Sequence, residues 1–195
     1  MAITINGSGT ITGVAVGGLP DGIVDKDTLA GGSSGPLLNC KSTLYTSSVD
    51  IAADSGNWQA GPFSVTITPA SASSKILILC HVCGGVGTGD NGEGPAFLIH
   101  RSVNGAAFAA TDAIGDAYGS STRATSGGMW DTIDSEMTPI FSITFIDSPN
   151  TTSAIEYKPY FHVHNGPLKI NRAGTSTSVE RITGTSSITA IEVAT

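Results

Sequence analysis

The 195-residue chain is short of charged residues. Asp, Glu, Lys and Arg make up 13% of it, against roughly a quarter of an average soluble domain. Ser and Thr instead occupy roughly a quarter of all positions, well above ordinary usage. Because charged side chains usually keep the surface of a monomer hydrated, this composition favours a protein that buries much of its surface against copies of itself.

The sequence also lacks the features of several protein classes. Its nine Lys and Arg are scattered singly and the net charge is −7, so there is no basic stripe of the kind that binds nucleic acid. No apolar run reaches the roughly eighteen residues of a membrane span. The N-terminus has neither the basic start nor the apolar core of a signal peptide, which predicts synthesis in a cytoplasm without export by that route.

Cysteines are few and odd in number. Cys40, Cys80 and Cys83 cannot form a complete set of disulfides, so we expect free, half-buried side chains. Cys80 and Cys83 match C-x-x-C, but residues three apart on a strand point to opposite faces and cannot share a metal. Residues 87–92 match G-x-G-x-x-G without a following helix, and residues 31–35 match G-x-S-x-G within a linker. No motif therefore predicts catalysis, and we expect a protein that is not an enzyme.

Short segments of alternating apolar and polar residues, separated by turn residues, make up most of the chain, and no long segment shows helical periodicity. This pattern predicts an all-β fold, an antiparallel β-sandwich or jelly roll. Residues 111–136, rich in Gly, Ser and Thr, are expected to form a long surface loop. The expected strands are 41–51, 63–68, 75–83, 96–103, 106–108, 139–146, 154–165, 168–171 and 187–193.

The first 36 residues form a different kind of segment. Alternation around Asn6-Gly7 predicts a short β-hairpin, but the apolar residues are too few to build a core, so the segment must pack on something else. Residues 31–36 have the composition of a flexible linker. We therefore expect a docking arm and linker over 1–36 and a β-sandwich head over 37–195. The candidate docking residues are Ile3, Ile5, Ile11, Val14, Val16 and Leu19.

Two groups of side chains are candidates for ligand binding. His162 and His164 would share one face of a strand, and three copies around a trimer axis would offer six nitrogens, an octahedral set for a transition metal. The alternative is a pair of surface or interface histidines without a ligand, and no other cofactor is expected. Trp58, Tyr118 and Trp130 are expected in exposed loops, where aromatic rings can contact sugars.

Five segments, which include both ends of the chain, carry a resemblance to a known family: residues 11–22, 24–30, 73–78, 169–175 and 186–194. They resemble segments of phage tail-fibre-like virion proteins. The resemblance implies a virion appendage, usually trimeric, whose N-terminal part docks on the particle, and it transfers no catalytic residues. Because no shaft separates the arm from the head, this would be a short, shaftless form.

Three functions follow as expectations. The first is a short tail fibre or receptor-binding appendage on the virion surface, with its arm on the tail and its head facing a host surface glycan. The second is a capsid decoration or head-fibre protein, whose arm adds strands to the edges of capsid subunits. The third is a carbohydrate-binding, lectin-like module. The expected partners are other copies of the chain and other virion proteins. None of the three functions involves nucleic acid or membrane insertion.

Overall fold

The computed structural model describes residues 4–5, 11–12, 37–54, 57–86, 95–127, 138–163, 167–174 and 182–194. The chain divides into two compact units, Met1–Gly35 and Pro36–Thr195. In the first unit, β1 (Thr4–Ile5) pairs antiparallel with β2 (Ile11–Thr12), and Ile5 lies opposite Ile11. The hairpin predicted around Asn6-Gly7 is therefore confirmed.

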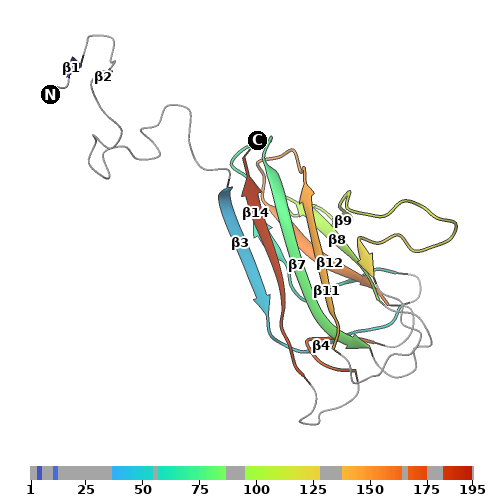
Figure 1. Cartoon of the computed structure of the whole chain (residues 1–195). Coiled ribbons are helices and arrows are strands. Elements are labelled where there is room, and N and C mark those ends of the chain that lie inside the picture. The colour runs from blue at the N-terminus through green and yellow to red at the C-terminus, as the bar shows by residue number, and fades with distance from the viewer. Residues whose placement is uncertain are drawn as a thin grey trace. The chain divides into compact units, whose positions relative to one another are not determined.

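In the described residues of the second unit the regular elements are all strands, which confirms the predicted all-β class. Its first sheet comprises β3 (Leu37–Tyr45), β4 (Val49–Ile51), β7 (Lys75–Val86), β11 (Ile140–Asp147), β13 (Leu168–Ile170) and β14 (Ser186–Val193). β14 and β13 pair with successive parts of β7, and β3 and β4 pair in turn with β14 and β13. β11 pairs with the other side of β7. The order is therefore β3/β4, β14/β13, β7, β11, with antiparallel neighbours throughout (Figure 1).

The second sheet repeats this plan of four positions. It comprises β5 (Gln59–Ala60), β6 (Val65–Ile67), β8 (Ala96–Val103), β9 (Ala109–Ala110), β10 (Ser126–Gly127) and β12 (Ile155–His162). β5 and β6 pair with one side of β12, and β8 pairs with the other. β9 and β10 pair with the far side of β8. The order is therefore β5/β6, β12, β8, β9/β10, again antiparallel.

One hydrophobic core lies between the two sheets. Alternate residues of the long strands point inward, as in Ile76 and Ile78 of β7 or Ile155 and Tyr157 of β12, and these side chains are fully buried. Aromatic rings meet across the gap: the ring centroids of Phe97 in β8 and Phe141 in β11 are 4.5 Å apart. The arrangement is a β-sandwich, whose inner faces interdigitate to form the core.

Asn171 joins the collinear strands of the first sheet. It is fully buried and has a φ of 62°, a left-handed conformation that Asn adopts more readily than most residues. Its backbone N–H donates to the Cys83 carbonyl, and its side-chain amide donates to the carbonyls of Tyr45 and Ser47. Its side-chain oxygen accepts a hydrogen bond from the Ser186 hydroxyl. Asn171 therefore closes the gaps between β13 and β14 and between β3 and β4.

Several strand predictions are wrong in detail. The single strand expected over 41–51 is interrupted at 46–48, where the carbonyl of Ser47 bonds to Asn171 instead of a strand neighbour. The strand that follows the Asn104-Gly105 turn pairs at Ala109–Ala110, not at 106–108. The loop expected over 111–136 contains β10, and Thr111 is buried with its hydroxyl donating to the Ile99 carbonyl. Part of this segment is therefore held against β8.

The cysteines are free, as expected, but the prediction that they are half-buried is wrong: one is exposed and two are buried. Cys80 lies in the core, and burial raises its thiol pKa to about 12. Cys83 is also buried, on the opposite face of β7, where a side chain at Gly184 would meet its sulfur. Cys40 is exposed, because it lies on the outward side of the edge strand β3. Within the described residues, no helix is long and apolar enough to span a membrane.

Candidate functional site

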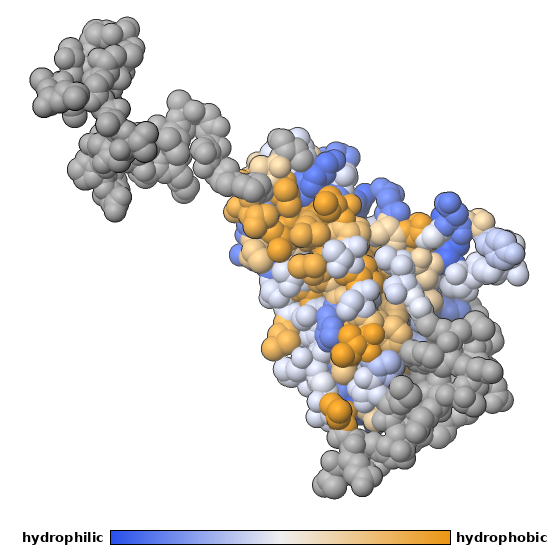
Figure 2. Space-filling model, viewed as in Figure 1, coloured by the Kyte–Doolittle hydropathy of each residue, from blue (hydrophilic) through white to orange (hydrophobic). Residues whose placement is uncertain are grey.

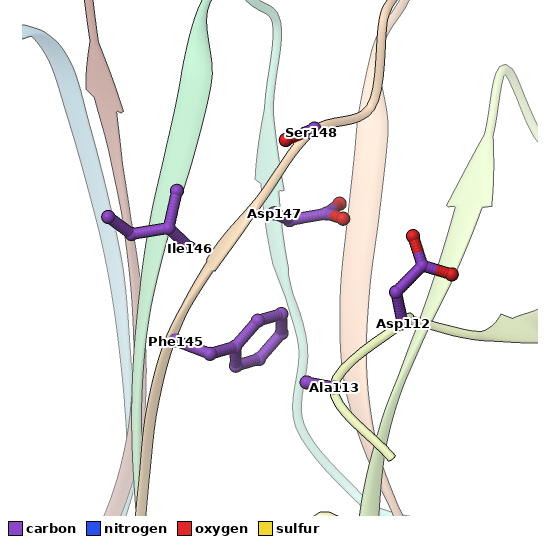
Figure 3. A pocket seen from close by; sticks show the side chains of 6 residues that line it. All are labelled: Asp112, Ala113, Phe145, Ile146, Asp147 and Ser148. Carbon is purple, nitrogen blue, oxygen red and sulfur yellow. The ribbon is translucent and has the colours of Figure 1, made fainter.

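A polar pocket of the described residues lies beside the end of β11. It has a volume of about 300 Å³ and is lined by Asp112, Ala113, Phe145, Ile146, Asp147 and Ser148. The side chains of Phe145 and Asp147 point from β11 toward the segment that carries Asp112, while Ile146 points the other way, as strand alternation requires (Figure 3). Two carboxylates and an aromatic ring therefore border one space.

Asp147 is the centre of a buried polar network. Its carboxylate accepts hydrogen bonds from Arg101 Nη1 at 2.5 and 2.7 Å and from the Tyr157 hydroxyl at 2.7 Å. The Asp147 side chain is only 2% exposed, whereas that of Arg101 is 25% exposed. Asp147 belongs to the first sheet, and Arg101 in β8 and Tyr157 in β12 belong to the second. The network therefore links the two sheets at the pocket.

The network fixes the charges that border the pocket. Burial, followed by the hydrogen bond and charge of Asp147, raises the pKa of Tyr157, so the phenol stays protonated. Partial burial lowers the pKa of Arg101, but the hydrogen bond and charge of Asp147 outweigh it and Asp112 adds to them, so the net shift is upward. Arg101 balances the charge of Asp147, and Asp112 is exposed and able to accept further hydrogen bonds.

A second cluster occupies the outward side of the second sheet. The rings of His100 and Tyr160 stack with centroids 4.0 Å apart, and Phe108 packs against Tyr160 at 5.9 Å. The Lys158 ammonium lies 4.9 Å from the Phe108 ring centroid, within cation–π range. Burial lowers the pKa of His100, and among the described residues its two ring nitrogens have no hydrogen-bond partner.

The predicted aromatic ligand contacts lie in different surroundings. Trp58 is half-buried beside His162, with ring centroids 5.5 Å apart. Tyr118 is 84% exposed in the segment between β9 and β10. Trp130 lies outside the described residues. Trp58 thus flanks the outward side of the second sheet, Tyr118 is an exposed ring, and sugar contact at these positions stays a prediction.

The predicted metal pair is described only in part. His162 closes β12 on its outer side, against Trp58, and His164 lies outside the described residues. Within one copy of the described chain, no group of three or more His, Cys, Asp or Glu side chains is placed to hold a metal ion. A site shared by three copies across an axis is a different arrangement, and it stays a prediction.

The predicted docking residues fall on the first unit. Ile5 and Ile11 are directly paired in the β1–β2 hairpin. The hairpin gives these two positions a defined backbone register, and docking itself stays a prediction. Ile3, Val14, Val16 and Leu19 lie outside the described residues.

Sequence reasoning missed the Asp147 network, although part of the signal was present. In β11 the inward positions are Phe141, Ile143, Phe145 and Asp147, so the alternation itself puts a carboxylate on the apolar face of a strand. A charge at such a position requires a partner. The partner, Arg101, lies 46 residues away in the chain, a separation that no local pattern reveals.

No protein-family model matches the chain, and no curated protein is significantly similar to it.

Proposed function

We propose that the chain is a structural protein of a phage virion, a short tail fibre or receptor-binding appendage that is attached by its N-terminal segment. The observation that carries the proposal is the division into an N-terminal unit with a β-hairpin and a separate β-sandwich. A hairpin with exposed strand edges can add to a sheet of another protein. The sandwich is then free to contact the host surface. This role is one of binding, without catalysis.

We further propose that the sandwich is a jelly roll. The two sheets have four strand positions each, because β3/β4, β5/β6, β9/β10 and β13/β14 each share one position. Numbered in chain order, the first position pairs with the eighth, the second with the seventh, the third with the sixth and the fourth with the fifth. A long hairpin of four strand pairs, folded over into two sheets, has these pairings, and jelly rolls recur in viral capsid and lectin domains. The strand order thus supports a virion role.

Immunogold microscopy of intact particles with an antibody against the purified chain tests the proposal. Label at the tail supports the appendage, and label on the capsid supports the alternative of a decoration protein. Unlabelled particles would overturn both. A second arm replaces Ile5 and Ile11 with Asp in the full chain, which should abolish incorporation into particles. The matched control replaces their hairpin neighbours Thr4 and Thr12 with Ala.

A second candidate function, carbohydrate binding, is favoured by the pocket beside β11. Carboxylate and hydroxyl groups at Asp112 and Ser148 can bond to sugar hydroxyls, and Phe145 supplies an apolar surface. Calorimetry with purified host-surface polysaccharide should show binding that Asp112→Asn weakens. Asp116→Asn, on an exposed residue outside the pocket, is the control. Release of reducing ends from the polysaccharide would contradict the proposed lack of enzymatic activity.

A further inference from the structure

The outward face of the first sheet is unusually apolar. In antiparallel strands, directly paired residues point to the same side, so the pairing register defines the rows of this face. One row runs Cys40, Ile191, Leu77, Ile146, and the next runs Ser42, Thr189, Leu79, Thr144. A third row runs Leu44, Ser187, His81, Ser142. We call these rows, together with Leu37 and Val193 at one end and Ile140 at the other, the outer face.

Large apolar side chains of the outer face are exposed. Leu37, Leu44, Ile140 and Ile146 each retain 61–65% of their accessible surface, and Leu79 at the centre is 38% exposed. Figure 2 shows apolar surface gathered over one end of the strands of this sheet, with smaller, separate apolar areas toward the other end. A solvated sheet normally presents polar residues on its outer side, and a contiguous apolar patch marks an interaction surface.

The charges on the two sheets differ in a way that favours a second copy of the chain as the partner. The outer side of the second sheet includes Glu156 and Lys158, which form an ion pair at 3.4 Å. The paired positions of the outer face include no carboxylate. Lys75, which pairs with Val193 and points to the same side, lies at one end and donates to Ser148. The chain carries a net charge of −7, so two copies repel each other wherever carboxylates meet. This face is where two copies can approach without that repulsion.

The shape of the outer face also suits contact with a second copy of the chain. Near its centre is a hollow of about 160 Å³, with Leu79 beside small hydroxyl side chains that include Ser142, Thr144, Ser187 and Thr189. Around the hollow stand the exposed side chains of Leu44, Ile140 and Ile146. A protruding Leu or Ile of a second copy has a matching recess here, and the hydroxyls can bond to one another, as Ser42 and Thr189 do within one copy at 2.8 Å.

We propose that the outer face packs against a second copy of this chain and forms the contact through which the protein self-associates. This inference specifies the surface for the self-association expected of a virion component, so it rests on the proposed function in that respect. It is tested on purified protein in solution, and failure to find the chain on particles would leave the result of that test unchanged.

Light scattering and sedimentation of the purified full chain at micromolar concentration provide the first test. We expect a mass of two or more copies. The double variant Leu44→Asp, Ile146→Asp places carboxylates on the face, and its dissociation constant should rise by about 100-fold or more, since unpaired charges would be buried. Tyr118→Asp, at an even more exposed position away from the face, should leave the mass unchanged.

The native thiol of Cys40 reports on the same contact. It is exposed in the single chain and lies in a row of the outer face, whereas Cys80 and Cys83 are buried. Alkylation of Cys40 in the assembled wild type should be at least about tenfold slower than in the double variant, because local opening must precede reaction. Circular dichroism checks that each variant is folded. If the Asp variants unfold, Leu44→Ser with Ile146→Thr, side chains already present on this face, replaces them.

A monomeric wild type at micromolar concentration would overturn the inference. A wild-type oligomer whose mass survives the folded double variant would also overturn it. The same holds for an oligomer in which Cys40 reacts as fast as in the monomeric variant, because the contact would then lie elsewhere on the chain.

Discussion

Removing the carboxylate of Asp147 should loosen the two sheets from each other. Asp147→Ala leaves the Arg101 guanidinium and the Tyr157 hydroxyl without their shared acceptor. Breaking a buried ion pair from one side costs about 3–5 kcal/mol. Because the Arg101 side chain is 25% exposed and can turn to water, the lower end, about 3 kcal/mol, is expected here.

Tyr157→Phe gives an intermediate effect for the same reason. It removes one hydrogen bond to a charged group, worth about 1.5–3 kcal/mol, and leaves Arg101 paired with Asp147. Since both substitutions act on one network, the double variant should lose less stability than the sum of the two single losses.

The control for this series is Asp50. Its carboxylate pairs with Lys169 at 2.8 Å and Arg172 at 2.5 Å but is 43% exposed. Exposed pairs of this kind contribute about 0–1 kcal/mol, so Asp50→Ala should have little effect. Urea unfolding at one fixed protein concentration measures all four variants, and thermal unfolding should show Asp147→Ala about 6–12 °C below the wild type. An Asp147→Ala loss no larger than that of Asp50→Ala would refute the reasoning.

Three further predictions concern single positions. Gly184→Ala should cost about 1–3 kcal/mol in urea unfolding, because its Cβ would overlap the Cys83 sulfur, and Cys83→Ala should restore most of that loss. Burial lowers the pKa of His100, so its contribution to stability is fully present above its unfolded pKa of about 6.5 and is lost as the pH falls through the folded pKa. His100→Gln should therefore make stability fall less steeply as the pH is lowered, and an unchanged slope would count against this reasoning. Asn171→Ala removes three side-chain hydrogen bonds and the residue that tolerates a φ of 62°, so a loss of about 3 kcal/mol or more is expected by calorimetry, and a loss under about 1 kcal/mol would mean that water replaces the amide.

The sequence predicts the long strands because their pattern is local. In β7, β8, β11, β12 and β14, alternate or continuous apolar residues mark the strand whatever its neighbours are. The two-residue strands β5, β9 and β10 lack such a pattern, because each is defined by the ladder of the strand beside it. Positions of this kind depend on the whole fold.

The candidate sites were harder to predict for a related reason. Residues two apart, such as Tyr160 and His162, can be placed on one face from spacing alone. The stacking of His100 on Tyr160 depends on the register between β8 and β12, and the pocket depends on where the segment after β9 lies against β11. The apolar outer face was also hidden, because a strand with apolar residues on both sides reads simply as a central strand.

The pairing of Leu37 with Val193 has a practical consequence for anyone who attaches a label to this protein. The chain enters the sandwich and completes its last strand at the same end of one sheet, while Tyr45 and Ser186 mark the opposite end. A fluorophore or peptide fused after Val193 would therefore emerge beside Leu37, where the N-terminal segment joins the sandwich. If that segment anchors the protein, such a fusion would crowd the anchored end, and a probe meant to face outward belongs at the end of the sheet marked by Tyr45.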